Sequence, residues 1–289
     1  MGVFYALLTA VSFSLLEPVS KVIAGQINPY AITFIRFFIG ALILMPFSLK
    51  KLRRENLRLT KKDVLIMAAL GSFMICTSMI VLQIAVKMAT SPSVIAIVFC
   101  TNSVMTIVIS SVVFKDRMNG RKLCALLLCV AGICLCVDVR GDNPISAVAL
   151  AFFAAVCFSV YTVISKRYMT RLPGTVQTGV SFLLGSLVLL VILLVSGVRV
   201  LDGVTRASLV PLLILGVVVT GLGYTFYFKA MEISGAGVAA LAFFIKPVMS
   251  PFVALLVNKT PVTWNVICAA LLVLCGSYLN SAKSNTASQ

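Results

Sequence analysis

The sequence predicts an all-α membrane protein of ten transmembrane helices, arranged as two repeated halves of five. Three observations predict this fold: an apolar composition, a regular succession of apolar runs, and an internal repeat. Of the 289 residues, 61% are hydrophobic and 11% are charged, and the mean hydropathy is +1.11. Soluble domains are about 45 to 50% apolar and about 25% charged. Because one helical crossing takes roughly 20 residues, the chain has room for about ten crossings and for no sizeable soluble domain.

Apolar runs separated by charged residues, glycine or proline place the predicted helices in chain order. The third and eighth runs have the least distinct ends. We assign residues 1–140 to a first five-helix repeat, 141–282 to a second, and 283–289 to a polar tail. The predicted helices cover residues 3–24, 30–49, 63–86, 92–114, 122–139, 144–166, 174–197, 208–231, 236–257 and 263–281.

Lysine and arginine residues are distributed unevenly between the two sets of loops. Sixteen of them fall on the side that holds both termini and six on the opposite side. Basic loops stay in the cytoplasm, so both termini are predicted to be cytoplasmic in a multi-pass protein of the plasma membrane. This pattern also explains the net charge of +16 without a nucleic-acid partner. The first apolar run lacks a basic start and retains Glu17 and Lys21, so we expect a retained helix and no cleaved signal peptide.

The nine cysteines lie mostly inside apolar runs, where they behave as small hydrophobic residues. Cys134 and Cys136 are spaced as a pair, but the chain has no histidine and no second pair nearby. The sequence therefore predicts neither disulfides nor a metal site, and no motif in it requires a cofactor.

The repeat appears when the sequence is aligned with itself at an offset of 145 residues. Residues 10–21 and 155–166 are then identical at six of twelve positions, and residues 33–44 and 178–189 at five of twelve. Chance would give roughly one match per window in so biased a chain. Since each half has an odd number of crossings, the second half must enter the membrane from the opposite side. Such inverted repeats hold a substrate site near the bilayer midplane and expose it to each side in turn.

These features resemble the EamA family of the drug/metabolite transporter superfamily. The resemblance covers nearly the whole chain and rests on loose patterns: an aromatic residue and a serine in the first and sixth helices, and a lysine that closes each. Arg36 in the second helix, Pro247 in the ninth and Asp116 before the fifth also match. The matching residues of the first and sixth helices are Phe13, Ser14, Lys21, Phe158, Ser159 and Lys166.

The two halves differ at two of the matching positions. Pro247 corresponds to Asn102 in the fourth helix, and Asp116 corresponds to Thr260. The first half is therefore polar where the second is kinked, which suits a site specialised for one ligand.

Charged residues inside a membrane are costly, about 2.5 to 3.5 kcal/mol each, and they tend to face a cavity or a partner. Glu17 precedes Pro18, which loosens the first helix locally, and is a candidate cation or proton site. Its alternative is an ion pair with Lys21 one turn on. Arg36 is a candidate ligand residue, with snorkelling or a structural bond as the alternative. Lys246, before Pro247, needs a counter-charge, water or an anionic ligand.

Aromatic and polar residues complete the candidate site, and helix packing or interfacial anchoring is the alternative for each. Lys229 and Glu232, one turn apart, are expected to form an interfacial ion pair and are left out of the site. The further candidates are Ser14, Gln83, Asn102, Tyr161, Tyr224, Tyr227 and Phe243.

The resemblance implies a secondary active transporter that works by alternating access and exports amino acids or related zwitterionic metabolites. Proton coupling and a homodimer remain open. The alternative is an uptake carrier for an organic cation, a nucleoside or a phosphorylated sugar. The chain has no Walker motif, which argues against a pump. An intramembrane enzyme is disfavoured because there is no histidine and no paired intramembrane aspartate, and a channel because no filter-like loop is present.

Overall fold

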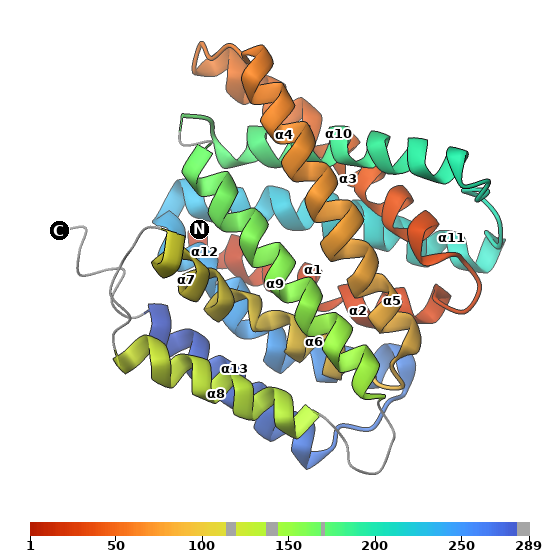
Figure 1. Ribbon diagram of the computed structural model, residues 1–289, viewed down its shortest axis with the longest axis vertical. Coiled ribbons are helices and arrows are strands. Elements are labelled where there is room, and N and C mark those ends of the chain that lie inside the picture. The colour runs from red at the N-terminus through yellow and green to blue at the C-terminus, as the bar shows by residue number, and fades with distance from the viewer. Residues whose placement is uncertain (114–119, 137–143, 169–170, 282–289) are drawn as a thin grey trace.

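The computed structural model describes residues 1–113, 120–136, 144–168 and 171–281. Within these ranges the chain is helical and has no strand (Figure 1). Asp116 and the predicted tail 283–289 lie outside the described residues.

The first half forms the five predicted crossings, and two of them are broken and one is partly π-helical. In chain order the elements are α1 (Gly2–Ser14) and α2 (Leu16–Ile23), α3 (Pro29–Arg54), α4 (Lys61–Phe73) with the π-helix η1 (Met74–Met79) and α5 (Ile80–Met88), α6 (Pro92–Cys100) and α7 (Asn102–Val113), and α8 (Gly120–Cys136).

The second half also forms its five crossings. Its elements are α9 (Ile145–Tyr168), α10 (Gly174–Val195), α11 (Arg206–Leu213) with the π-helix η2 (Ile214–Leu222), α12 (Gly223–Asn258), and α13 (Trp264–Ser281). The long α12 contains two crossings, because Gly235 interrupts it with φ 80° and ψ 171°, a conformation that glycine adopts at little cost. The ten predicted helices are therefore confirmed.

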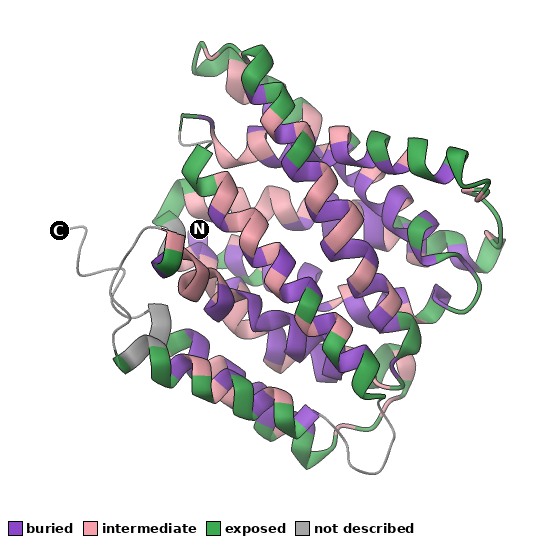
Figure 2. Cartoon of the chain, viewed as in Figure 1, coloured by how far each residue is buried: buried purple, intermediate pink, exposed green. Residues whose placement is uncertain are grey.

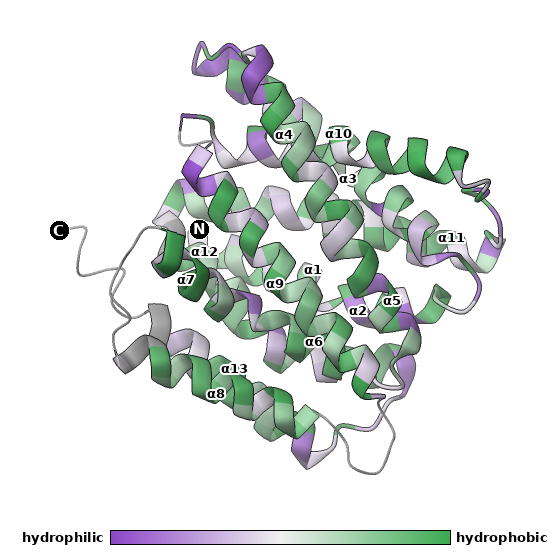
Figure 3. Ribbon diagram, viewed as in Figure 1, coloured by the Kyte–Doolittle hydropathy of each residue, from purple (hydrophilic) through white to green (hydrophobic). Residues whose placement is uncertain are grey.

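Eight helices among the described residues are long and apolar enough to span a membrane, and two shorter apolar helices, Leu123–Cys136 and Trp264–Leu279, accompany them. Figure 2 shows buried residues concentrated inside the bundle and exposed ones along its outer faces. Figure 3 shows hydrophobic residues along α8 and α10, while the tip between α3 and α4 is hydrophilic. An apolar outside with polar ends is the pattern of a protein whose sides contact lipid.

The two halves pack through matching pairs of helices. The crossing of α1 and α2 lies against η2 and α12, and its counterpart α9 lies against η1, α5, α6 and α7. Likewise α3 packs on η2 as α10 packs on α4, while α3 pairs with α10 and α8 pairs with α13. The packing scheme is therefore unchanged when the halves are exchanged.

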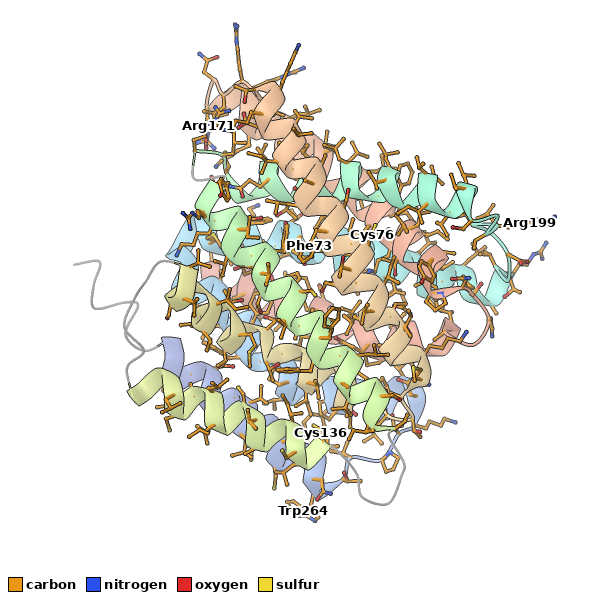
Figure 4. All side chains as sticks on the ribbon, viewed as in Figure 1. Phe73, Cys76, Cys136, Arg171, Arg199 and Trp264 are labelled. Carbon is orange, nitrogen blue, oxygen red and sulfur yellow. The ribbon has the colours of Figure 1, made fainter. Side chains whose placement is uncertain are left out.

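The two sides of the bundle can be followed from the labelled ends. The N-terminus and the last turns of α13 lie at the left of Figure 1, and Arg171 lies toward that side in Figure 4. Arg199 lies at the opposite side. We call the first the N-terminal face and the second the Arg199 face.

Close contact between α4 and α10 depends on two glycines from different halves. A Cβ atom on Gly71 would lie 2.1 Å from the carbonyl oxygen of Ser181, and one on Gly185 would lie 2.5 Å from the carbonyl carbon of Gly71. Small residues allow helix backbones to approach in this way in membranes.

We predict that Gly71→Ala destabilises the protein by about 1 to 3 kcal/mol, the usual cost of overpacking. Gly25→Ala is the matched control, because a Cβ atom there meets nothing within 4 Å. Thermal unfolding of the purified variants in detergent measures the difference. Equal midpoints for the two variants would show that the α4–α10 contact is looser than described.

Candidate functional site

A cavity lies where the irregular parts of both halves meet. The break between α1 and α2, the break between α6 and α7, and both π-helices contribute to its wall. The centre of a water molecule can occupy about 40 Å³ of this cavity. The residues that line it are Phe13, Leu16, Arg36, Phe37, Met79, Phe99, Cys100, Asn102, Phe158, Val219, Thr220, Tyr224, Phe243 and Lys246.

The sequence explains both breaks. Pro18 has no N–H group to donate to the carbonyl of Ser14, and the helix is interrupted at Leu15. In the fourth crossing, three consecutive side chains turn back onto carbonyls of the preceding turn: Thr101 bonds Val98, Asn102 bonds Phe99 and Ser103 bonds Cys100, at 2.7 to 3.0 Å. Such bonds compete with the helical pattern and bend helices.

The π-helices η1 and η2 occupy related positions in the repeat. An offset of 145 carries Met74–Met79 onto residues 219–224, which overlap η2. Met79 from η1 and Val219 and Thr220 from η2 line the cavity. Irregular backbone inside a membrane is tolerated where it borders a cavity, and π-bulges are frequent at functional sites.

An ion pair is buried beside the cavity. The Lys246 Nζ atom lies 2.7 Å from Glu17 Oε1, and the two side chains are 5% and 0% exposed. Lys246 also lies over the Phe99 ring, 5.4 Å from its centroid. Lys246 lines the cavity, whereas Glu17 is buried behind Lys246 and does not line it. The second carboxylate oxygen of Glu17 has no partner among the described residues.

Arg36 is a second buried cation, and it forms no ion pair with any residue that the structure describes. Its guanidinium donates to the Met79 sulfur at 3.4 Å and lies 4.5 Å from the Phe37 ring centroid. The Nε atom has no partner in the described part of the protein. Arg36, Lys246 and Glu17 together give the site a formal charge of +1.

Aromatic rings form much of the remaining wall. Phe13 lies 5.1 Å from Tyr224 and 5.7 Å from Phe243, centroid to centroid. Phe99 and Phe158 form a second pair at 5.6 Å. Aromatic faces bind both apolar groups and cations, so the cavity combines an apolar wall with an excess positive charge.

None of the three charges is repeated at the equivalent position of the other half. At the offset of 145, Glu17 corresponds to Thr162 and Lys246 to Thr101, while Arg36 corresponds to Ser181. Thr162 and Thr101 bond carbonyls of their own helices.

The structure brings five of the predicted site residues to the cavity wall: Arg36, Asn102, Tyr224, Phe243 and Lys246. Glu17 lies directly behind the wall through its ion pair.

Four other candidates lie outside the wall. Ser14 is buried and donates to the carbonyl of Ala10 at 2.7 Å, and Gln83 is buried in α5. Tyr161 packs on Phe158 and Tyr227 packs on Phe243. These four residues can support the wall but do not form it here.

The expected ion pair between Lys229 and Glu232 is wrong, and the alternative pair of Glu17 with Lys21 does not form either. Lys229 lies over the Tyr5 ring, 4.9 Å from its centroid, and Glu232 pairs instead with Lys51 at 2.7 Å. Glu17 does not pair with Lys21, whose ammonium group donates to the backbone carbonyls of Lys87 and Ala89. In both cases a partner from a distant part of the chain displaces the neighbour one turn away.

Sequence reasoning missed several wall residues because they are ordinary apolar or small side chains. Phe37, Met79, Phe99 and Thr220 carry no motif. A signal did exist for Phe37 and Phe99, since each lies within three residues of a predicted site residue, Arg36 or Asn102.

Comparisons with known proteins agree with this architecture. A model of the EamA-like transporter family matches residues 1–137 and again residues 145–282. An uncharacterized transporter of Clostridium kluyveri is 30% identical over 99% of this chain and 94% of its own length. The uncharacterized transporter YyaM of Bacillus subtilis is 21% identical over 93% and 89%. A solved structure described only as the crystal structure of a protein has a TM-score of 0.66 at 16% identity, covering 100% of this chain and 99% of that one.

We predict that Lys246→Met destabilises the protein by about 3 to 5 kcal/mol, because it leaves a buried carboxylate without its counter-charge. The double variant Glu17→Gln with Lys246→Met should recover most of this loss. Lys51→Met is the control: Lys51 is 23% exposed and its partner Glu232 55%, and exposed pairs contribute only about 0 to 1 kcal/mol. Thermal unfolding measures all three variants, and a double variant no more stable than Lys246→Met would contradict the pairing.

Proposed function

The chain belongs to the EamA-like transporter family, and from this we propose that this multi-pass membrane transporter is a secondary active carrier that exports amino acids or related zwitterionic metabolites. One observation carries the proposal: an arginine without a counter-ion borders an aromatic cavity at the meeting point of the two halves. A buried guanidinium of this kind is suited to a carboxylate, which it can bind through two parallel hydrogen bonds.

The ammonium group of the same substrate also has partners at the cavity. Aromatic faces attract cations, by about 2 kcal/mol or more where water is excluded. Phe13, Tyr224 and Phe243 supply such faces. Glu17 supplies a negative charge near them, and its second oxygen is free of protein partners in the described region. A zwitterion therefore complements both signs of charge in the site.

Alternating access is supported by how the halves are joined on the N-terminal face. Lys51 and Asp63 of the first half bond Glu232 and Arg171 of the second. These pairs close that face between the halves. A substrate that enters the cavity from that side therefore requires the halves to separate there. We take the halves to be inverted repeats and the N-terminal face to be cytoplasmic in the plasma membrane, from the odd number of crossings and the loop charges.

A second candidate is uptake of an anionic solute such as a phosphorylated sugar. The formal charge of +1 on the site favours it. A substrate series separates the two: an amino acid, its N-acetyl derivative and the corresponding amine. An exporter of zwitterions should accept the first compound and reject the other two.

We predict that Arg36→Gln weakens the apparent affinity for the amino acid by roughly 10- to 150-fold, since a charge-assisted hydrogen bond contributes about 1.5 to 3 kcal/mol. Counterflow of labelled amino acids in proteoliposomes is the measurement. Arg53→Gln, an exposed position on the same helix, should leave counterflow unchanged. Wild-type counterflow in Arg36→Gln would reject Arg36 as the ligand, and a conductance without trans-stimulation would reject the carrier.

A further inference from the structure

Buried polar atoms without hydrogen-bond partners gather around α2. The described residues contain six such side-chain atoms, and five of them belong to α2 or to the two helices α5 and α12 that pack on it. The sixth is Arg36 Nε at the cavity. The five atoms are Glu17 Oε2, Ser20 Oγ, Gln83 Nε2, Ser250 Oγ and Asn258 Oδ1.

Two contacts fix how α2 lies along α12. Lys246 bonds Glu17 at 2.7 Å, and Asn258 donates to the carbonyl of the next residue, Pro18, at 3.1 Å. Both contacts meet α2 in its first turn, while Lys246 and Asn258 lie about three turns apart on α12. Ser250 lies between them, one turn from Lys246, and is fully buried. Ser20 stands one turn from Glu17 and is also fully buried.

An unsatisfied buried polar group costs about 1 to 3 kcal/mol, so a cluster of five is too expensive to leave dry. Hydroxyl, amide and carboxylate groups are the partners that ordered waters use, two to four groups to each water. The polar seam formed by the five groups is therefore suited to a file of waters between α2, α5 and α12.

The polar seam leads toward the Arg199 face. There α2, α5 and α12 end at Ile23, Met88 and Asn258. The Lys21 ammonium ties α2 to the end of α5 through two carbonyls. On the same face lies an open polar crevice of about 460 Å³, formed by the two loops that follow α2 and α10 and lined by Gln26, Asn28, Gly197, Val198, Arg199, Asp202 and Gly203.

We propose that Glu17 is a proton-binding site that protons reach from the Arg199 face through this polar seam. The proton comes from water in the seam and forms an O–H bond at Oε2, the oxygen that Lys246 leaves free. The carboxylate becomes a neutral acid, and Lys246 keeps its charge without a counter-ion. A metal cation suits the position less well, because the described residues contain no group of three or more acidic, cysteine or histidine side chains that could hold one.

The charged and titratable groups around Glu17 come from three elements. Lys246 and Tyr224 belong to α12, Arg36 to α3 and Cys100 to α6. Lys87 of α5 and Arg206 of α11 are exposed, and η2 has no titratable residue.

The coupling consequence rests on the proposed function. Among the described residues, Glu17 carries the only negative charge near the cavity, so a proton on Glu17 and the ammonium group of a zwitterion exclude one another. Proton entry would then accompany amino-acid exit. The proton site itself does not depend on the identity of the substrate.

Infrared difference spectroscopy of the reconstituted protein, titrated with acid and without any organic solute, tests the proton site. The wild type should gain a C=O band of a protonated, buried carboxyl group that Glu17→Gln lacks. Glu55→Gln, an exposed carboxylate, should keep the band. Identical difference spectra for the wild type and Glu17→Gln would overturn the proposal.

Silver-ion accessibility tests the route, since Ag⁺ is small enough to follow a file of waters. In a background without native cysteines, Ser20→Cys and Ser250→Cys should react with Ag⁺ added on the Arg199 side. Ser14→Cys should not, because Ser14 is equally buried in the same crossing but its hydroxyl is satisfied by Ala10. Protection of all three thiols, or equal reaction of all three, would overturn the proposal. Neither experiment needs a substrate, so a failed counterflow assay leaves both results interpretable.

Discussion

The rest of the structure depends on how three buried ionisable side chains are accommodated inside an apolar bundle. Glu17 and Lys246 neutralise each other at 2.7 Å, while Arg36 has only the Met79 sulfur and the Phe37 ring. Desolvating a charge in hydrocarbon costs several kcal/mol. Arg36 has no counter-ion among the described residues, and the carboxylate of the proposed substrate would supply one.

The backbone around these charges is irregular in both halves, but the charges are not repeated. Breaks and π-helices occur in the first, third, fourth and eighth crossings, and they converge on one cavity. The duplicated architecture thus supplies irregular backbone from both halves around the cavity. The positions equivalent to Glu17 and Lys246 hold the uncharged residues Thr162 and Thr101, so the ion pair is not duplicated. We infer that the symmetry serves the motion and the asymmetry serves recognition.

Much of the fold followed from the sequence because lipid imposes a simple rule: about 20 apolar residues per crossing, ended by charge, glycine or proline. Gly235 marks the boundary between the eighth and ninth crossings as expected. The site was less predictable. Lys246 called for a counter-charge, yet Glu17 lies 229 positions away, and no local pattern pairs them. The pairs Glu17–Lys21 and Lys229–Glu232 failed because spacing along one helix says nothing of a better partner on another. The π-helices have no sequence signature in a single chain, so Met79 and Thr220 could not be placed at the cavity.

The central claim is that one cavity between the halves opens to the two faces in turn. Spin-label distances across the halves test it most directly, with one pair at Glu55 and Glu232 on the N-terminal face and another at Gln26 and Arg199 on the opposite face. On addition of a transported amino acid at saturation, the account predicts that one distance lengthens as the other shortens. Two distances that both stay fixed, or that lengthen together, would contradict it.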